Sequence, residues 1–172
     1  MLNRTFFITL AALVFISGCG YHLKGMGNSL PGKYRTIAIL PVENKSFQAD
    51  LGPLLDSAIA EEFSRSQRLQ VVSESEADLV LTTTILTYSD TPVSFSAADQ
   101  ARDYRVQVII DSLLVAREGS GTVWKGKGLK EMTDYSVVPG EIVEAESSRR
   151  TAKEELAGEF AELIHDSVFE GF

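Results

Sequence analysis

The hydrophobic pattern of the chain predicts strands of two kinds. Residues 36–42 form a short continuous apolar run, which is typical of a strand buried on both faces. Residues 78–88 and 104–115 alternate apolar and polar side chains, and residues 122–135 follow a glycine-containing segment at 118–121 that predicts a hairpin turn. We therefore expect four main strands, with a short strand or extended connection at residues 69–72.

Two other segments have the period of an amphipathic helix. Asp50 is expected to cap the first of them, which runs to about Ser66 with its apolar residues on one face. The second should run from about Val143 to Val168, and its predicted buried stripe is Leu156, Phe160, Leu163, Ile164 and Val168. Residues 89–102 are polar and contain Pro92, which favours a loop or an irregular hairpin tip.

The order of these elements predicts the fold class. It is α+β, a two-layer sandwich in which a mixed sheet of about four strands carries two amphipathic helices packed on one face. The chain shows no internal repeat and no boundary for a second folded domain. We expect three parts: a cleaved signal peptide at 1–18, a glycine-rich tether at 19–34 and a single domain at 35–172.

The N-terminus predicts a lipid anchor on Cys19, the single cysteine of the chain. A basic residue, Arg4, precedes an apolar run of 11 residues at 6–16, and the small residues Ser17 and Gly18 come directly before Cys19. The run is shorter than the roughly 20 residues that a membrane-spanning helix needs. We expect a diacylglyceryl group and an amide-linked acyl chain (palmitate) on Cys19, which together anchor a protein stably. The alternative is an ordinary signal peptide followed by a buried thiol.

Charge is distributed unevenly along the expected mature chain. Residues 19–172 carry 15 basic and 24 acidic side chains, a net charge of −9, but residues 102–130 alone have a net charge of +3. Nucleic-acid binding usually needs a basic face across the domain, so this composition argues against a nucleic-acid partner. It is compatible with local contact to an anionic group.

Catalytic and metal-binding patterns are missing from the sequence. His22 and His165 have no partner at a spacing suited to a metal site, and a surface or helix-cap role is the better interpretation for both. No nucleophile elbow or phosphate-binding loop occurs either. We therefore expect no enzyme activity, no metal and no cofactor apart from the covalent lipid on Cys19.

One basic segment is unusual, the run from Trp124 to Lys130. In a strand, Lys125 and Lys127 share a face about 7 Å apart, and Gly126 and Gly128 should leave the opposite face bare for the approach of a partner. The candidate ligand-binding residues are basic side chains from this segment and from the preceding strand: Arg102, Arg105, Lys125, Lys127 and Lys130. A solvent-facing strand with scattered lysines is the alternative.

Several motifs resemble the lipopolysaccharide-assembly lipoprotein family (LptE). They are the heptapeptide at 19–25, Leu30-Pro31, the stretch at 37–44 that ends in Leu-Pro-Val-Glu-Asn, the segments at 77–81 and 104–106, and the final helix. The likeness covers essentially the whole mature chain. It implies a two-helix, four-stranded α+β domain that plugs the outer-membrane β-barrel of the lipopolysaccharide translocon, LptD.

The resemblance also implies where the protein acts and what it binds. The protein would be lipid-anchored on the periplasmic side of the outer membrane, in its inner leaflet. There it would receive lipopolysaccharide for insertion into the outer leaflet and help the barrel to assemble. With this resemblance, the basic residues become favoured contacts for lipopolysaccharide. The alternative function is an outer-membrane lipoprotein that serves another envelope machine, as an accessory protein, a pilotin or an activator.

Overall fold

The computed structural model describes residues 30–118 and 121–170. The expected signal peptide, Cys19, His22 and most of the tether lie outside the described residues, as do the two central residues of the hairpin turn at 118–121.

Six strands of the described chain form one mixed sheet. In chain order the elements are β1 (Thr36–Ile39), β2 (Glu43–Asn44), α2 (Leu51–Ser66), β3 (Gln70–Val71), the short 3-10 helix η2 (Glu74–Glu76), β4 (Leu79–Phe95), β5 (Ala101–Ala116), β6 (Thr122–Ser136) and α3 (Ile142–Glu170). The strand order is β3-β1-β4-β5-β6, with β2 also beside β4. β1 runs parallel to β3 and β4, whereas β4, β5 and β6 are antiparallel.

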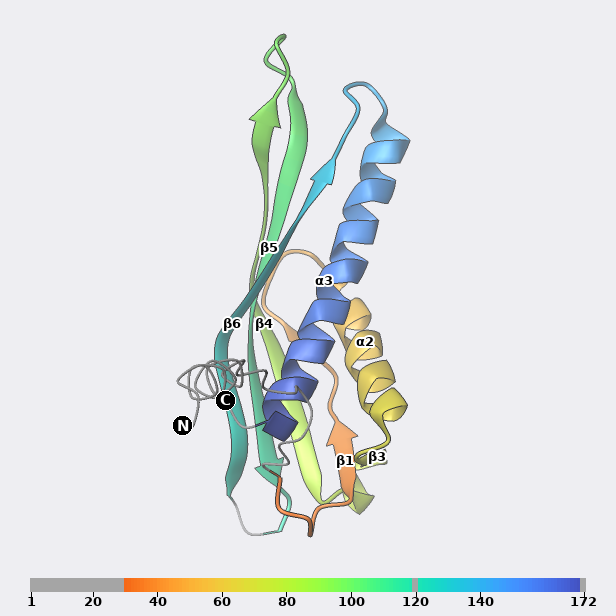
Figure 1. Cartoon of the computed structure of the whole chain (residues 1–172), viewed down its shortest axis with the longest axis vertical. Coiled ribbons are helices and arrows are strands. Elements are labelled where there is room, and N and C mark those ends of the chain that lie inside the picture. Colours follow the sequence, from red (N-terminus) through yellow and green to blue (C-terminus); the bar gives the residue numbers. More distant parts are fainter. Residues whose placement is uncertain (1–29, 119–120, 171–172) are drawn as a thin grey trace, which may run out of the picture.

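The predicted α+β class, with two helices over one face of the sheet, is confirmed (Figure 1). The sheet contains more strands than the expected four because β2 and β3 are two additional short strands of two residues each. None of the helices in the described segments is long and apolar enough to cross a membrane.

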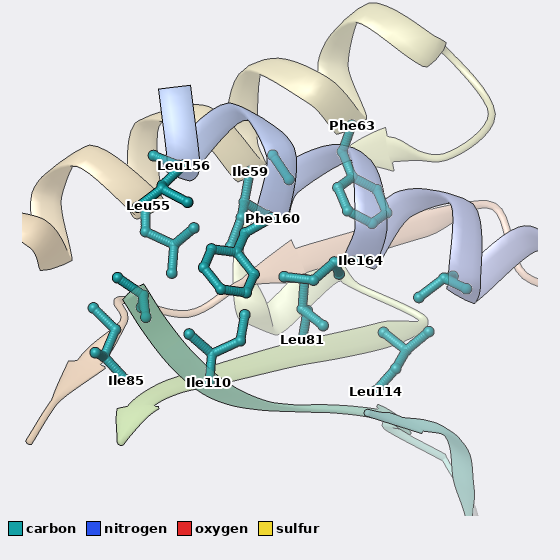
Figure 2. Packing of buried hydrophobic residues seen from close by; sticks show 14 of the residues in the cluster. Leu55, Ile59, Phe63, Leu81, Ile85, Ile110, Leu114, Leu156, Phe160 and Ile164 are labelled. Atoms are coloured by element: carbon teal, nitrogen blue, oxygen red, sulfur yellow. The ribbon is translucent and has the colours of Figure 1, made fainter. Parts of the chain in front are cut away.

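In the described part of the chain, a hydrophobic core lies between the helices and the sheet. Alternate residues of the two central strands point to the helices, and α2 and α3 each contribute one stripe, as the sequence pattern predicts (Figure 2). The labelled members are Leu81 and Ile85 of β4, Ile110 and Leu114 of β5, Leu55, Ile59 and Phe63 of α2, and Leu156, Phe160 and Ile164 of α3.

The start of α2 differs from the expectation. Asp50 precedes the helix but makes no side-chain capping hydrogen bond, so its predicted capping role is wrong. Its carboxylate instead accepts a hydrogen bond at 2.5 Å from Nζ of Lys153 on α3, and that lysine is only 2% exposed. Asp50 therefore joins the two helices rather than closing the end of one.

Of the two structures predicted for residues 89–102, a loop or an irregular hairpin tip, the segment has the second, although most of it is strand. β4 continues through Pro92 to Phe95, and β5 starts at Ala101, so only a short tip remains between them. Proline has no N–H to donate to a neighbouring strand. The pairing of β1 and β2 with β4 ends by Ile85, so within the described chain β4 has no neighbour on that side at Pro92. A proline is tolerated in such an edge position. The backbone hydrogen bonds to β5 outweigh the polar composition of this segment.

Candidate functional site

Within residues 30–118 and 121–170, one face of the sheet is covered by neither α2 nor α3, and we call it the open face (Figure 1). On β5 the residues that point to the helices are buried, whereas Ile109, Leu113 and Val115 alternate with them and are only partly buried. The open face therefore has an apolar column along β5, which Asp111 interrupts between Ile109 and Leu113.

Three lysines stand beside this column on β6. The antiparallel register places Lys125 opposite Leu113 and Lys130 opposite Ile109, and paired residues of neighbouring strands share a face. Lys127 follows the helix-facing Gly126 and therefore also belongs to the open face. All three lysines are exposed.

A β-bulge at Lys127 and Gly128 brings the third lysine onto this face. Two residues of β6 oppose the single residue Asp111 of β5 at this point. Gly128 has a φ of +60°, a left-handed conformation that suits glycine, and its N–H donates to Oδ1 of Asp111 at 2.7 Å. Without the bulge, strict alternation from Lys125 would direct Lys130 toward the helices. The extra residue shifts the alternation by one position, so Lys130 lies on the open face.

The glycine at position 126 does not leave a bare face. A Cβ atom there would lie 2.7 Å from both Cη2 of Trp124 and Cδ1 of Leu129, so these side chains already occupy the space. The prediction of an accessible glycine face is therefore wrong at Gly126. Position 126 requires glycine because the indole of Trp124, which packs against the core, lies directly over it.

The two candidate arginines lie along β5 beyond the lysine row, toward the β4–β5 tip. Arg105 alternates with the buried Val106 and so also belongs to the open face, four residues from Ile109, the partner of Lys130, or about 13 Å at the usual strand rise. Its guanidinium donates to both carboxylate oxygens of Asp134, at 2.7 and 2.8 Å, and these hydrogen bonds lower the pKa of Asp134 and raise that of Arg105. Arg102 lies near the β4–β5 tip, where its carbonyl accepts a hydrogen bond from Val137. The three lysines therefore form one row, Arg105 lies on the same face but is paired with Asp134, and Arg102 lies farther along β5.

A polar network that the sequence did not suggest joins α3 to the sheet. The hydroxyl of Tyr135 donates to Asp90 at 2.9 Å, and Nε of Arg149 lies 3.0 Å from that hydroxyl and 2.9 Å from the Asp90 carboxylate. The pKa of Tyr135 is raised to about 12, and burial of the hydroxyl contributes most to this shift. These residues come from three separated segments, so no local motif predicts them.

The histidine of α3 is a packing residue. His165 is 7% exposed, and its ring lies 5.3 Å from that of Phe63 and 4.7 Å from that of Phe169. The predicted surface or cap role is therefore wrong for His165. Within residues 30–118 and 121–170, no three His, Cys, Asp or Glu side chains gather closely enough to hold a metal ion.

Comparison with known families identifies the group to which this fold belongs. The family model described as LptE, lipopolysaccharide-assembly, matches residues 34–168, from just before β1 almost to the end of α3. The chain belongs to the LptE family. No curated protein matches it significantly.

Solved lipoprotein structures share the fold of this LptE family member. A candidate lipoprotein from Caulobacter crescentus CB15 has a TM-score of 0.55 at 16% identity, with 77% of this chain and 86% of that chain covered. A minor lipoprotein from Acinetobacter baumannii has a TM-score of 0.52 at 10% identity, covering 78% and 90%. For the rare lipoprotein B from Shewanella oneidensis the TM-score is 0.50 at 13% identity, covering 76% and 92%. At these identities the likeness concerns the fold alone.

Proposed function

We propose that this protein is a non-enzymatic lipopolysaccharide-assembly lipoprotein that acts as plug and assembly factor of the outer-membrane barrel translocon, LptD. Lipid on Cys19 holds it to the periplasmic side of the outer membrane. It receives lipopolysaccharide on its way to the outer leaflet. Membership in the LptE family supports the assembly role.

The open face is the observation that carries the ligand-binding part of this proposal. Lipopolysaccharide combines anionic phosphates with apolar acyl chains, so its receptor needs cations beside an apolar surface. The lysine row on β6 and the apolar column on β5 provide these side by side. Lys125 and Lys130 oppose residues four positions apart on β5, so the row spans about 13 Å.

The five basic candidates differ in how well their surroundings support a contact with phosphate. Lys125, Lys127 and Lys130 meet phosphate as mobile charges, because their ammonium groups are exposed and the bulge brings them to one face. Arg105 is occupied by Asp134, so we assign it to joining β5 and β6. Arg102 remains a candidate for a separate contact near the hairpin tip.

Charge reversal on the open face tests the proposed ligand. In the double variant Lys125→Glu with Lys127→Glu, we expect affinity for purified lipopolysaccharide to fall at least tenfold, or about 1.4 kcal/mol. The matched control is Lys33→Glu with Arg150→Glu, which makes the same charge change at exposed positions outside the open face. Equal affinities for the two double variants would mean that the lysine row is an ordinary solvated surface.

Two further experiments test the partner and the anchor. The lipidated full chain should co-purify with a large β-barrel protein in mild detergent, and its isolation without one would contradict the plug role. Cys19→Ala should move the protein into the soluble periplasmic fraction. If the variant stays in the outer membrane, the barrel rather than the lipid retains it.

A further inference from the structure

A second surface lies on the helix side of β6, where α3 leaves a groove along the strand. The groove has a volume of about 620 Å³, and its apolar floor includes Leu129 of β6 and Leu163 of α3. Both leucines are partly buried against the core. The groove is therefore a continuation of the core that is open to solvent.

Carboxylates surround this apolar floor. Five carboxylates line the groove, and none of the described lining residues is basic. The carboxylates are Glu131 of β6 and Glu159, Glu162, Asp166 and Glu170 of α3. Burial raises the pKa of Glu159, and the negative charges of Glu131, Glu155 and Glu162 raise it further. Like charges in such proximity repel one another, so a cationic occupant would relieve a repulsion that exists in the isolated chain.

The groove also runs beside an unpaired strand. β6 is the last strand in the sheet order, so within the described chain its outer backbone edge has no partner. Free edges of this kind bind extended peptides by adding a strand, with main-chain hydrogen bonds for affinity and side-chain pockets for specificity. An apolar floor, a rim of carboxylates and a free strand edge thus lie next to one another around Leu129.

We propose that this groove binds an extended, lysine- or arginine-rich segment of a partner protein. The segment pairs with the edge of β6, places apolar side chains on Leu129 and Leu163, and directs its cations to the carboxylates. A second copy of the chain placed groove to groove is disfavoured, because it would bring the same negative charges. Dimerisation of the chain without peptide, through β6 paired with β6, would overturn the proposal. A metal ion is disfavoured too. The described residues contain no cluster of three side chains that could hold one, in the groove or elsewhere.

The test uses the full chain and a nine-residue synthetic peptide, in the absence of lipopolysaccharide. The odd-numbered residues of the peptide, which share one face of an added strand, are lysines around a central valine, and its even-numbered residues are threonine. We expect the peptide to bind with strong salt dependence. Replacing its lysines by glutamate, or its central valine by proline, should weaken binding at least tenfold, because the first change removes the charge match and the second the strand pairing. Equal binding of either altered peptide would overturn the proposal.

Charge-neutralising variants locate the peptide on the protein. In Glu159→Gln with Glu162→Gln, affinity for the lysine peptide should fall about tenfold. The control is Glu61→Gln with Glu154→Gln, two exposed helix residues outside the groove, and it should bind as the parent does. If both double variants weaken binding equally, the peptide responds only to net charge and the groove is not its site. Neither result depends on whether the open face binds lipopolysaccharide.

Discussion

The two faces of β6 differ in charge and in exposure. On the open face the strand presents Lys125, Lys127 and Lys130 beside a partly buried apolar column. On the helix face the same strand presents Leu129 and Glu131 to α3, in a groove lined by carboxylates. One strand thus separates a cationic surface from an acidic one, and the bulge at Gly128 keeps all three lysines on the same side.

This difference suggests a division of labour within the sheet. The helix face holds the core that stabilises the domain, whereas the open face can change its side chains at little structural cost. We therefore expect substitutions of the buried residues on the helix face to act on stability and those on the open face to act on lipopolysaccharide binding. The predictions below test that division, starting with the largest effect.

Neighbouring leucines of β5 provide the strongest contrast. Leu114 points to the helices and is fully buried, whereas Leu113 lies on the open face and is partly buried. Leu114→Ala should lower the free energy of unfolding by about 3 kcal/mol, and Leu113→Ala by about 1 kcal/mol or less. Chemical denaturation of both variants measures the difference, and equal losses would show that the open face is packed as tightly as the core.

The ion pair between α2 and α3 should give the next largest effect. Asp50→Ala leaves the buried ammonium of Lys153 without its carboxylate, whereas Lys153→Met removes the charge itself. We expect a loss of about 2 kcal/mol for Asp50→Ala, less than for a fully buried pair because Asp50 is half exposed, and under about 1 kcal/mol for Lys153→Met. If Lys153→Met lowered the stability more than Asp50→Ala, the attraction between the two charges would itself be stabilising the domain. The role of Asp50 would then not be limited to neutralising a buried ammonium group.

The same aspartate predicts a pH dependence. Partial burial opposes ionisation of Asp50, but hydrogen bonds from Lys153 and Gln48 outweigh it and lower its pKa in the folded state. The stabilisation by Asp50 is therefore complete above the unfolded pKa of about 3.9 and is lost as the pH falls through the lower folded value. The difference in unfolding free energy between the parent and Asp50→Ala should shrink below about pH 4. A difference that is constant from pH 7 to pH 2 would contradict this assignment.

The bulge should contribute less. Gly128→Ala forces a left-handed conformation on a residue with a side chain, which costs roughly 1–2 kcal/mol, whereas Gly128→Asn should cost less because asparagine tolerates that region. Denaturation curves for the two variants decide this. Equal stability of Gly128→Ala and the parent would mean that the bulge conformation is not required.

Sequence periodicity predicted most of the elements and the core. It did not predict the extension of β4 to Phe95, nor which side chains of β6 lie on each of its two faces. The stripes of α2 and α3 and the alternation of β5 follow directly from the spacing of apolar residues, and they place the core correctly. Lys153 could have been found, because it lies three residues before Leu156 on the buried stripe of α3. The bulge could not, because it arises from the pairing of Lys127 and Gly128 with Asp111, seventeen residues before Gly128. The grouping of the lysines depends on that pairing.

The most direct test of the account is to ask which face of the sheet lipopolysaccharide contacts. A photoreactive phenylalanine analogue can be placed at Leu113 on the open face or at Glu155, which is exposed on α3. After illumination with purified lipopolysaccharide, we expect cross-linking from position 113 and none above background from position 155. Cross-linking from position 155 with none from position 113 would contradict the assignment of the open face as the ligand-binding surface.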